Sequence, residues 1–458
     1  MKVYKLWLII AFSFLFVGIS FVRADNSWVA VYTDNIGYYK IDIAIAMAID
    51  TKGNIYVTGN GYGQDTSSDF MTIKYDKSGK VKWIQKYSGL TNLGDYAAGI
   101  AIDKSDDIYV TGTSYRSENA CDIATIKYTS SGKVIWTTKY HKSEYGDYLC
   151  KAKAIVVDSL KNVYITGTIS GSGTPYDYLT IKYNPLGFEE WVATYNGTGN
   201  SDDQPIGLVI DNIGNTYVTG GSIGENSNYD ITTIKYDTKG NQKWISEYNS
   251  QANILDAEDT PTGIGIDDKA NIYISGYSKS YFTKDYTILK IDSSGNIKWV
   301  ANYQGNGGGD DIATAIAVDN AGNVYITGYA DNLLSDYDYT TIKYNTIGQR
   351  QWVKTYNGNG NYQDFGYAIA LDYQGSIYVA GTSNAGISAY HSKKADDIIT
   401  IKYSATGDSI WAVKYSTDGY DKGIQIKTDI KNNVYILAET NPSDTIKSYL
   451  LIKYVQRY

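Results

Sequence analysis

The chain has little of the residue types that build most reactive centres. It contains 2 His, 2 Cys and 5 Pro among 458 residues. The histidines, His141 and His391, lie in widely separated parts of the chain, so we expect no metal site shared between them. No zinc-type spacing, phosphate-binding loop or nucleophile elbow is present. These absences argue against the enzyme classes that short motifs usually reveal.

Long apolar runs are also absent, with one exception at the start of the chain. Lys2 and Lys5 precede an apolar run at 6–22, and the small residue Ala24 is followed by polar residues. This order predicts a secretory signal peptide at residues 1–24, with an uncleaved membrane anchor as the alternative. No later run approaches the roughly 18 apolar residues of a membrane span. We therefore expect an exported protein, periplasmic, extracellular or on the cell surface, without membrane insertion after cleavage.

An excess of positive charge is missing as well. The net charge of the whole chain is −8. Loss of Lys2, Lys5 and Arg23 with the signal leaves 38 basic residues against 49 acidic ones, a net charge of −11. This balance excludes nucleic acid and anionic lipid as expected partners.

What the sequence does contain is a repeat. Tyr and Gly are abundant, with 47 and 45 residues, as in all-β chains with glycine turns. The segment GNVYITG at 322–328 is one of eight similar segments. They end at Gly59, Gly112, Gly167, Gly220, Gly276, Gly328, Gly381 and Ala438. Before each lies an apolar segment that ends at Asp50, Asp103, Asp158, Asp211, Asp267, Asp319, Asp372 and Asp429. After each comes a TIKY-like segment, and seven units then continue with W-x-x-x-Y.

Each unit thus predicts four short strands joined by tight turns, and a radial array of such units is a β-propeller. The TIKY-like segment of the last unit, at 449–455, has no W-x-x-x-Y after it. One W-x-x-x-Y lies instead at 28–32, before the first unit. We therefore predict one all-β domain at 25–458: an eight-bladed β-propeller with four-stranded antiparallel blades. The N-terminal strand 28–32 is expected to pair with 449–455 and close the ring, which removes exposed sheet edges.

The units also resemble a known family. Residues 303–352 are similar throughout to the bacterial SBBP β-propeller repeat, and the resemblance covers essentially all of 28–458. It implies an exported bacterial propeller. The family name refers to seven blades, whereas this chain counts eight. The resemblance brings no catalytic residues with it.

Two sets of Asp residues fall on the face with the longer Gly- and Asn-rich loops. The first Asp ring consists of Asp42, Asp95, Asp203, Asp259, Asp311, Asp364 and Asp421, with Cys150 in the third unit. The second Asp ring consists of Asp69, Asp122, Asp177, Asp230, Asp285, Asp338 and Asp397, with Ser448 in the last unit. We interpret them chiefly as Asx residues that accept backbone N–H bonds, because every unit repeats them. The alternative is a negative ring that collects cations such as Ca²⁺ or a basic ligand, although no EF-type spacing is present. No cofactor is otherwise expected.

The third strand of every unit carries a Lys, at 74, 127, 182, 235, 290, 343, 402 and 453. We expect each Lys to lay its stem on Tyr or Trp and to pair with a repeated Asp, rather than to bind a ligand.

Two departures from the repeat are candidate sites. Cys121 and Cys150 fall in adjacent units, and the alternatives are a disulfide or two unpaired, partly buried thiols. The segment 381–397 contains an insertion with Tyr390, His391, Lys393 and Lys394, a basic and aromatic patch on an acidic face. A partner contact is expected there, with a tolerated surface insertion as the alternative.

These features favour a monomeric, non-catalytic binding or scaffold module for a protein or glycan. The candidate ligand contacts are Tyr390, His391, Lys393, Lys394, Asp311 and Asp364. One alternative is a polysaccharide-active enzyme that uses two ring Asp carboxylates at the mouth of the axis. Another is a structural component of the cell surface. The sequence does not distinguish a protein ligand from a glycan.

Overall fold

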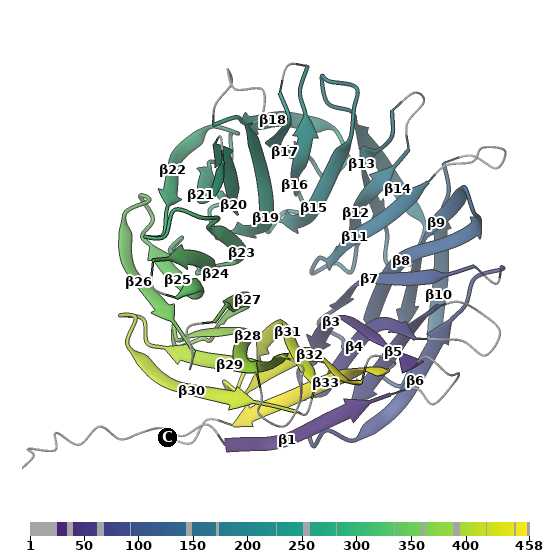
Figure 1. Ribbon diagram of the computed structural model, residues 1–458. Coiled ribbons are helices and arrows are strands. Elements are labelled where there is room, and N and C mark those ends of the chain that lie inside the picture. Colours follow the sequence, from purple (N-terminus) through teal and green to yellow (C-terminus); the bar gives the residue numbers. More distant parts are fainter. Residues whose placement is uncertain are drawn as a thin grey trace, which may run out of the picture.

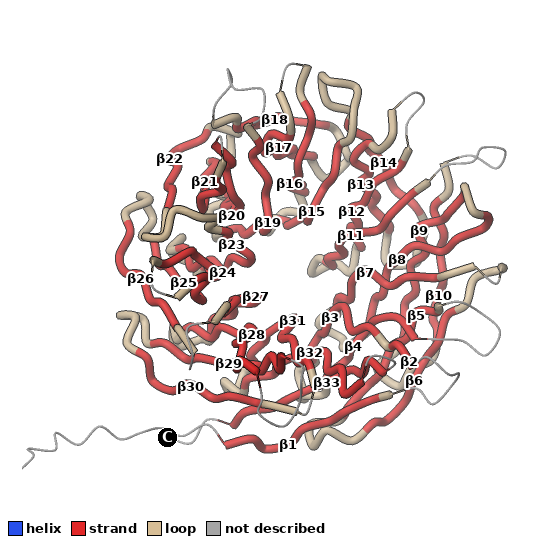
Figure 2. The backbone as a smooth tube through the Cα atoms, in the orientation of Figure 1, coloured by secondary structure: helices blue, strands red, loops and turns tan. Residues whose placement is uncertain are grey.

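The strands of the protein form eight sheets arranged around one axis. The computed structural model describes residues 25–455 except 34–39, 62–67, 92, 143–148, 171–173, 226, 251–256, 281, 334, 359–361, 388–393, 418 and 444–445. Within these residues seven sheets are built of four antiparallel strands in sequence order, and the eighth combines β31, β32 and β33 with strands from the start of the chain. Strands with short connections account for almost the whole trace (Figures 1 and 2). No helix in this described part is long and apolar enough to cross a membrane. The eight-bladed propeller predicted from the repeat is confirmed.

Four strands follow one another from the axis to the rim in each blade. The inner strands are β3 (Ile43–Ile49), β7 (Asp95–Ile102), β11 (Cys150–Val157), β15 (Asp203–Ile210), β19 (Glu258–Ile266), β23 (Ile312–Val318), β27 (Asp364–Leu371) and β31 (Tyr420–Thr428). The second strands are β4 (Ile55–Gly61), β8 (Ile108–Ser117), β12 (Val163–Ile169), β16 (Thr216–Ile223), β20 (Ile272–Ser280), β24 (Val324–Asn332), β28 (Ile377–Ile387) and β32 (Val434–Ser443). The third strands are β5 (Asp69–Tyr75), β9 (Ala120–Tyr128), β13 (Asp177–Tyr183), β17 (Tyr229–Tyr236), β21 (Thr283–Ile291), β25 (Asp336–Tyr344), β29 (Lys394–Tyr403) and β33 (Ile446–Val455). The outer strands are β6 (Val81–Tyr87), β10 (Val134–Tyr140), β14 (Glu189–Tyr195), β18 (Gln242–Tyr248), β22 (Ile297–Tyr303), β26 (Arg350–Tyr356), β30 (Ser409–Tyr415) and β1 (Asp25–Tyr32).

The two ends of the chain share the last blade. β1 pairs antiparallel with β33, so that Trp28 lies opposite Lys453 and Tyr32 opposite Tyr449 (Figure 1). The predicted closure by 28–32 and 449–455 is therefore present. The short strand β2 (Lys40–Ile41) adds a parallel pair with β33 on the way to the first blade. β1 supplies the outer strand that the last blade otherwise lacks, as closed propellers require.

The hydrophobic cores lie between adjacent blades. One core, for example, joins Tyr273 and Tyr286 of the fifth blade to Val324, Ile326 and Ile342 of the sixth. Because both faces of each sheet are covered, the second strand of a blade is buried at nearly every position, as in β12. This explains why the IYVTG-like segment that begins each second strand carries no charge on either face.

A β-bulge interrupts every inner strand at the same place. In β7 the register with β8 shifts between Ala97 and Gly99, and in β11 it shifts with β12 between Ala152 and Ala154. Such a bulge leaves one residue unpaired and changes the direction of its side chain. The bulge residue of each blade therefore takes a different environment from its paired neighbours.

One face of the propeller carries only tight turns, such as 50–54 and 76–80, and we call it the turn face. In these turns Gly53 and Gly79 take φ values of +79° and +84°. Where the repeat lacks glycine, Asp106, Lys161, Ala270 and Asn432 take the left-handed conformation instead. The opposite face, with the longer connections between blades, is the loop face.

Candidate functional site

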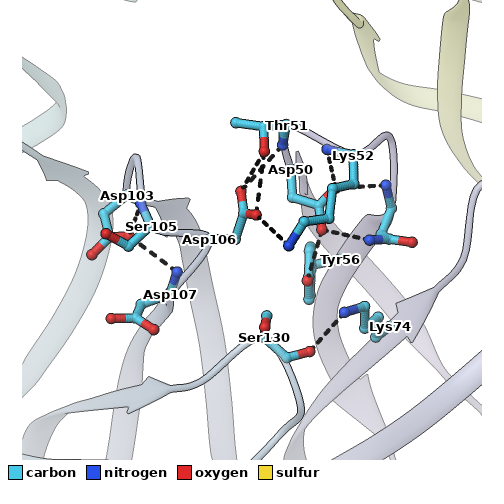
Figure 3. A network of polar contacts seen from close by, with 11 residues as sticks. Asp50, Thr51, Lys52, Tyr56, Lys74, Asp103, Ser105, Asp106, Asp107 and Ser130 are labelled. Carbon is cyan, nitrogen blue, oxygen red and sulfur yellow. Dashed lines mark hydrogen bonds and ion pairs between the residues drawn. The ribbon is translucent and has the colours of Figure 1, made fainter.

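A polar network repeats on the turn face of every blade. The Asp that ends each inner strand accepts a hydrogen bond from the Tyr hydroxyl of the second strand, as from Tyr56 to Asp50 at 3.1 Å (Figure 3). The same bond occurs in all eight blades, with Tyr56, Tyr109, Tyr164, Tyr217, Tyr273, Tyr325, Tyr378 and Tyr435 as donors. Asp50 also accepts the backbone N–H groups of Lys52 and Asn54. These eight Asp residues therefore hold turns and are not free for a ligand.

The Lys of each third strand lies over the ring of this same Tyr. The ammonium of Lys74 is 5.0 Å from the ring centroid of Tyr56, and the other seven pairs lie at 4.9–5.4 Å. The expected packing of Lys on an aromatic ring is confirmed.

The expected pairing of these Lys side chains with a repeated Asp is wrong in most blades. Lys74 donates instead to the backbone carbonyl of Ser130 in the next blade at 2.6 Å (Figure 3). Lys182, Lys235, Lys290, Lys343 and Lys453 donate in the same way. Lys127 differs, because it forms an ion pair with Asp107 at 3.3 Å. The neighbouring blade supplies the acceptor, which the repeat within one blade cannot reveal.

The Trp of seven outer strands donates a hydrogen bond to the turn between the third and outer strands of the next blade. Trp299 donates from its indole nitrogen to the carbonyl of Thr346 at 3.2 Å, the carbonyl that Lys290 also contacts. Trp28 does this at the closure, with the carbonyl of Lys77 at 3.0 Å. The repeated aromatic and basic residues therefore join blade to blade, and their role is structural.

On the loop face, the first Asp ring is buried. All seven of its side chains are 0–1% exposed. Six of them accept a backbone N–H at 2.6–2.7 Å from the loop that enters the blade, the donors being Gly89, Gly197, Ser250, Gly305, Gly358 and Thr417. The interpretation as loop-capping Asx residues is confirmed for these six.

The two Asp rings lie close together at the blade junctions, and this affects their protonation. Burial raises the pKa of Asp311 to about 6, although the N–H groups of Gly305 and Asp331 oppose the rise and the Asp285 carboxylate adds to it. Burial likewise raises the pKa of Asp95, Asp203 and Asp421, with a second-ring Asp as a further cause. Two carboxylates that share a buried junction disfavour each other's charged form. Among the described residues no group of three or more His, Cys, Asp or Glu side chains is arranged to hold a metal ion.

The cysteines occupy the junction where the first Asp ring is interrupted. Cys121 of β9 and Cys150 of β11 form a disulfide in the structure, with their Cα atoms 5.8 Å apart. Both side chains are buried, at 3% exposed. Stacking of the blades brings the third strand of one against the inner strand of the next, although these strands occupy different radial positions within a blade.

Some of the predicted ligand contacts lie outside the described residues, and others are buried. Tyr390, His391 and Lys393 lie outside the described residues, and Lys394 begins β29 with a side chain that is likewise not described. Asp311 and Asp364 are fully buried, which corrects the expectation that they face a ligand at the surface. Their carboxylates cap the entering loops instead. His141 is exposed directly after β10.

The structure brings together a set of residues that the repeat did not single out. Each inner strand contributes two of them, which follow the first-ring position by one and three residues. A buried small residue lies between the two, whereas they themselves are not buried. They are Ile43 and Ile45, Tyr96 and Ala98, Lys151 and Lys153, Gln204 and Ile206, Thr260 and Thr262, Ile312 and Thr314, Phe365 and Tyr367, and Lys422 and Ile424. We call this set the axial mouth, because the inner strands surround the axis (Figure 1) and these positions lie toward the loop face. These positions could have been found in the sequence, because their residues vary between units that are otherwise similar.

Two pockets open on the axial mouth. One, of about 380 Å³, is lined by four inner strands through residues that include Ile45, Thr314, Tyr367 and Ile424. There the Lys422 ammonium lies 4.6 Å from the ring centroid of Tyr367. The other, of about 220 Å³, lies between the second and third blades. A third pocket, of about 250 Å³ and lined by polar groups such as Glu225 and Glu247, lies farther out.

Comparison with known proteins agrees with the repeat and the fold. A family model described as the SBBP β-propeller repeat matches residues 247–282, 301–335 and 351–387. The chain carries SBBP repeats. An uncharacterized WD repeat-containing protein of Acanthamoeba polyphaga mimivirus is 23% identical over 88% of this chain. The chain spans about a third of the length of that relative, 34%.

Solved structures match the chain only at low identity and with TM-scores below 0.5. The WD40 domain of SCAP from fission yeast is 9% identical and covers 94% of this chain and 98% of its own, with a TM-score of 0.47. A puromycin hydrolase is 7% identical, covering 87% of this chain and 58% of its own, with a TM-score of 0.46. Likeness at this level says nothing about activity.

Proposed function

We propose that this protein is a non-catalytic binding module that receives a protein or glycan ligand at the axial mouth. The observation that carries the proposal is the contrast between repeated and varied residues. The Asp, Tyr, Lys and Trp of the repeat are engaged in turns and blade junctions. The axial mouth, in contrast, presents different side chains from two equivalent backbone positions in each of the eight blades. Function commonly resides where a rigid scaffold presents variable side chains.

The axial pocket of about 380 Å³ supports this proposal, because four blades contribute to it. A ligand there would contact apolar Ile45 and Ile424, the hydroxyl group of Thr314 and the charged head of Lys422. Mixed apolar and polar linings are typical of binding sites. The alternative of a polysaccharide-active enzyme is less well supported, since the first-ring carboxylates that it would use are 0–1% exposed.

We further propose that the module is exported and monomeric. The charged and apolar pattern of residues 1–24 supports export. The disulfide is consistent with an oxidising compartment. Closure of the ring by β1 supports a monomer, because it covers the edge that another chain would pair with.

The test is a glycan and peptide array probed with the mature protein and two variants. Ile424→Glu places a charge in the axial pocket, and we expect it to reduce the signal of true ligands at least tenfold. Tyr373→Glu serves as the control, because Tyr373 is 81% exposed on the turn face. Equal loss in both variants, or no ligand on either array, would contradict the proposal. Release of reducing ends from any bound glycan would overturn its non-catalytic part.

A further inference from the structure

Two lysines stand side by side at the axial mouth of the third blade. Lys151 and Lys153 occupy the first and third positions after Cys150 in β11, and both are exposed. Neither forms an ion pair with any residue that the structure describes. A pair of uncompensated ammonium groups is unexpected in a chain whose net charge is −8. Like charges so close disfavour each other, which a bound anion would relieve.

The junction around these lysines lacks the first-ring carboxylate that the other blades place at the start of the inner strand. Cys150 occupies the position of the first-ring Asp. At six other junctions that Asp accepts a backbone N–H from the entering loop. The second-ring acid of this junction, Asp122, is paired with Arg116 at 2.8 Å. Desolvation and the charge of Lys151 also lower the pKa of Lys153. The local electrostatics therefore favour an anion at this junction.

A pocket of about 220 Å³ lies at these lysines. Its lining includes Tyr96, Ala98, Thr113 and Tyr115 from the second blade, together with Lys151 and Lys153. Tyr96 is 44% exposed, and its ring meets that of Tyr115 edge-on at 6.1 Å. The pocket thus combines cations, hydroxyl groups and an accessible aromatic face. This volume is below that of usual drug-sized sites, so it suits a single small group of a larger ligand.

The walls of this pocket are fixed covalently. Cys150 directly precedes Lys151, and Cys121 lies opposite Tyr115 in the pairing of β8 with β9. The disulfide between these cysteines therefore joins both walls next to the pocket. The ammonium of Lys151 also lies 5.4 Å from the ring centroid of Tyr176. Such preorganisation reduces the entropy lost on binding.

We propose that this pocket binds the carboxylate of a uronic acid-containing saccharide. Lys151 and Lys153 pair with the carboxylate, and the sugar ring lies on Tyr96, with Thr113 and Tyr115 within reach of its hydroxyl groups. The inference deepens the proposed function and rests on its claim that the axial mouth receives the ligand. A bare anion would use the lysines but would leave the aromatic side of the pocket empty.

The test is calorimetric titration of the mature protein with trimers of galacturonate, glucuronate and mannuronate. The matched ligand controls are the methyl esters of the same trimers, which keep the rings and remove the charge. We expect at least tenfold weaker binding for the ester of the preferred trimer. Lys151→Gln and Lys153→Gln should each weaken acid binding at least tenfold, and Tyr96→Ala should weaken it at least fivefold. Lys298→Gln, on the outer strand β22, should leave binding within twofold.

Several outcomes would overturn the inference. These are no binding of any acidic trimer, equal binding of acid and ester, or unchanged binding in Lys153→Gln. Inorganic phosphate that competes as strongly as the trimer would show a general anion site and would also overturn it. These outcomes leave the proposed function standing as long as Ile424→Glu still removes the array ligands. Circular dichroism of each variant checks that the fold is retained.

Discussion

Individual side chains in this protein are divided between those that every blade repeats and those that differ. Asp311 belongs to the repeated group, and its carboxylate is fully buried while it accepts the N–H of Gly305 at 2.7 Å. Such a group stabilises a loop through its hydrogen bonds but is costly to ionise. A repeated acidic residue therefore indicates a structural requirement here, and its titration should appear in the stability of the fold.

The first prediction concerns the pH dependence of that stability. Burial raises the pKa of Asp311 to about 6, whereas an unfolded Asp titrates near 3.9. The folded state therefore binds this proton more tightly, so its contribution is complete below about pH 4 and is lost as the pH rises to about 6. The free energy of unfolding of the parent, relative to Asp311→Asn, should fall by roughly 2–3 kcal/mol over this window. Urea denaturation between pH 4 and 8 measures it.

Asp292→Asn is the control for this measurement. Burial of Asp292 is slight, and hydrogen bonds from Asn296 and Ser294 lower the pKa of Asp292. Its contribution is present above the unfolded pKa and is lost as the pH falls, so the pH trend has the opposite sign. Parallel trends for Asp311→Asn and Asp292→Asn would contradict the assignment of Asp311 as a buried, proton-retaining carboxyl.

At the scale of strands and turns, neighbouring blades are joined where the Trp of an outer strand contacts a turn of the next blade, as at seven of the eight junctions. Gly348 belongs to such a turn and takes a φ of +78°. A Cβ added there would meet the Cδ2 atom of Trp299 at 2.8 Å. The glycine thus serves two requirements, a left-handed backbone and close approach of an indole ring. A second turn glycine, Gly375, separates these two requirements.

The second prediction compares Gly348→Ala with Gly375→Ala. Gly375 has nearly the same φ, +79°, but nothing lies within 4 Å of an added Cβ. Both variants should lose about 1 kcal/mol through left-handed strain. Gly348→Ala should lose a further 1–3 kcal/mol, roughly, because the indole must move. Chemical denaturation measures both, and equal losses would show that the Trp–turn contact is not tightly packed.

At the scale of the whole molecule, the ring depends on β1. Without β1, the blade made of β31, β32 and β33 would end at β33, whose edge would pair only with the two-residue strand β2. An exposed edge offers unpaired N–H and C=O groups to other chains. The repeat makes the blades alike, and the pairing of β1 with β33 joins the two ends of the chain in one blade.

The third prediction tests this closure by comparing a chain that starts at Asp25 with one that starts at Asp34. The shorter chain lacks the pairing of β1 with β33 and the contact of Trp28 with the carbonyl of Lys77. We expect it to lose at least about 3 kcal/mol of stability, since several hydrogen bonds near 1 kcal/mol each are removed. Calorimetry reports the melting temperature, and size-exclusion chromatography reports association through the β33 edge. A shorter chain that melts like the longer one and stays monomeric would refute the role of β1.

The sequence by itself determined the number of blades, the order of strands and the closure. It did so because local sequence patterns recur along the chain: a Gly in most turns, an Asp at the end of each inner strand, and a Trp in each outer strand. The position of Trp28 before the first unit was enough to predict its pairing with 449–455. The residues that cap turns were also recognisable, since Asx chemistry is local.

Only the tertiary structure decided which side chains face the axis and which junction could take an anion. The acceptors of Lys74 and its counterparts belong to the next blade, so the spacing within one unit does not reveal them. The bulge in β11 directs Lys153 to the axial mouth. Stacking of the blades buries Asp311. The contacts between blades join residues about one unit apart in the chain, and they form only when neighbouring blades pack together.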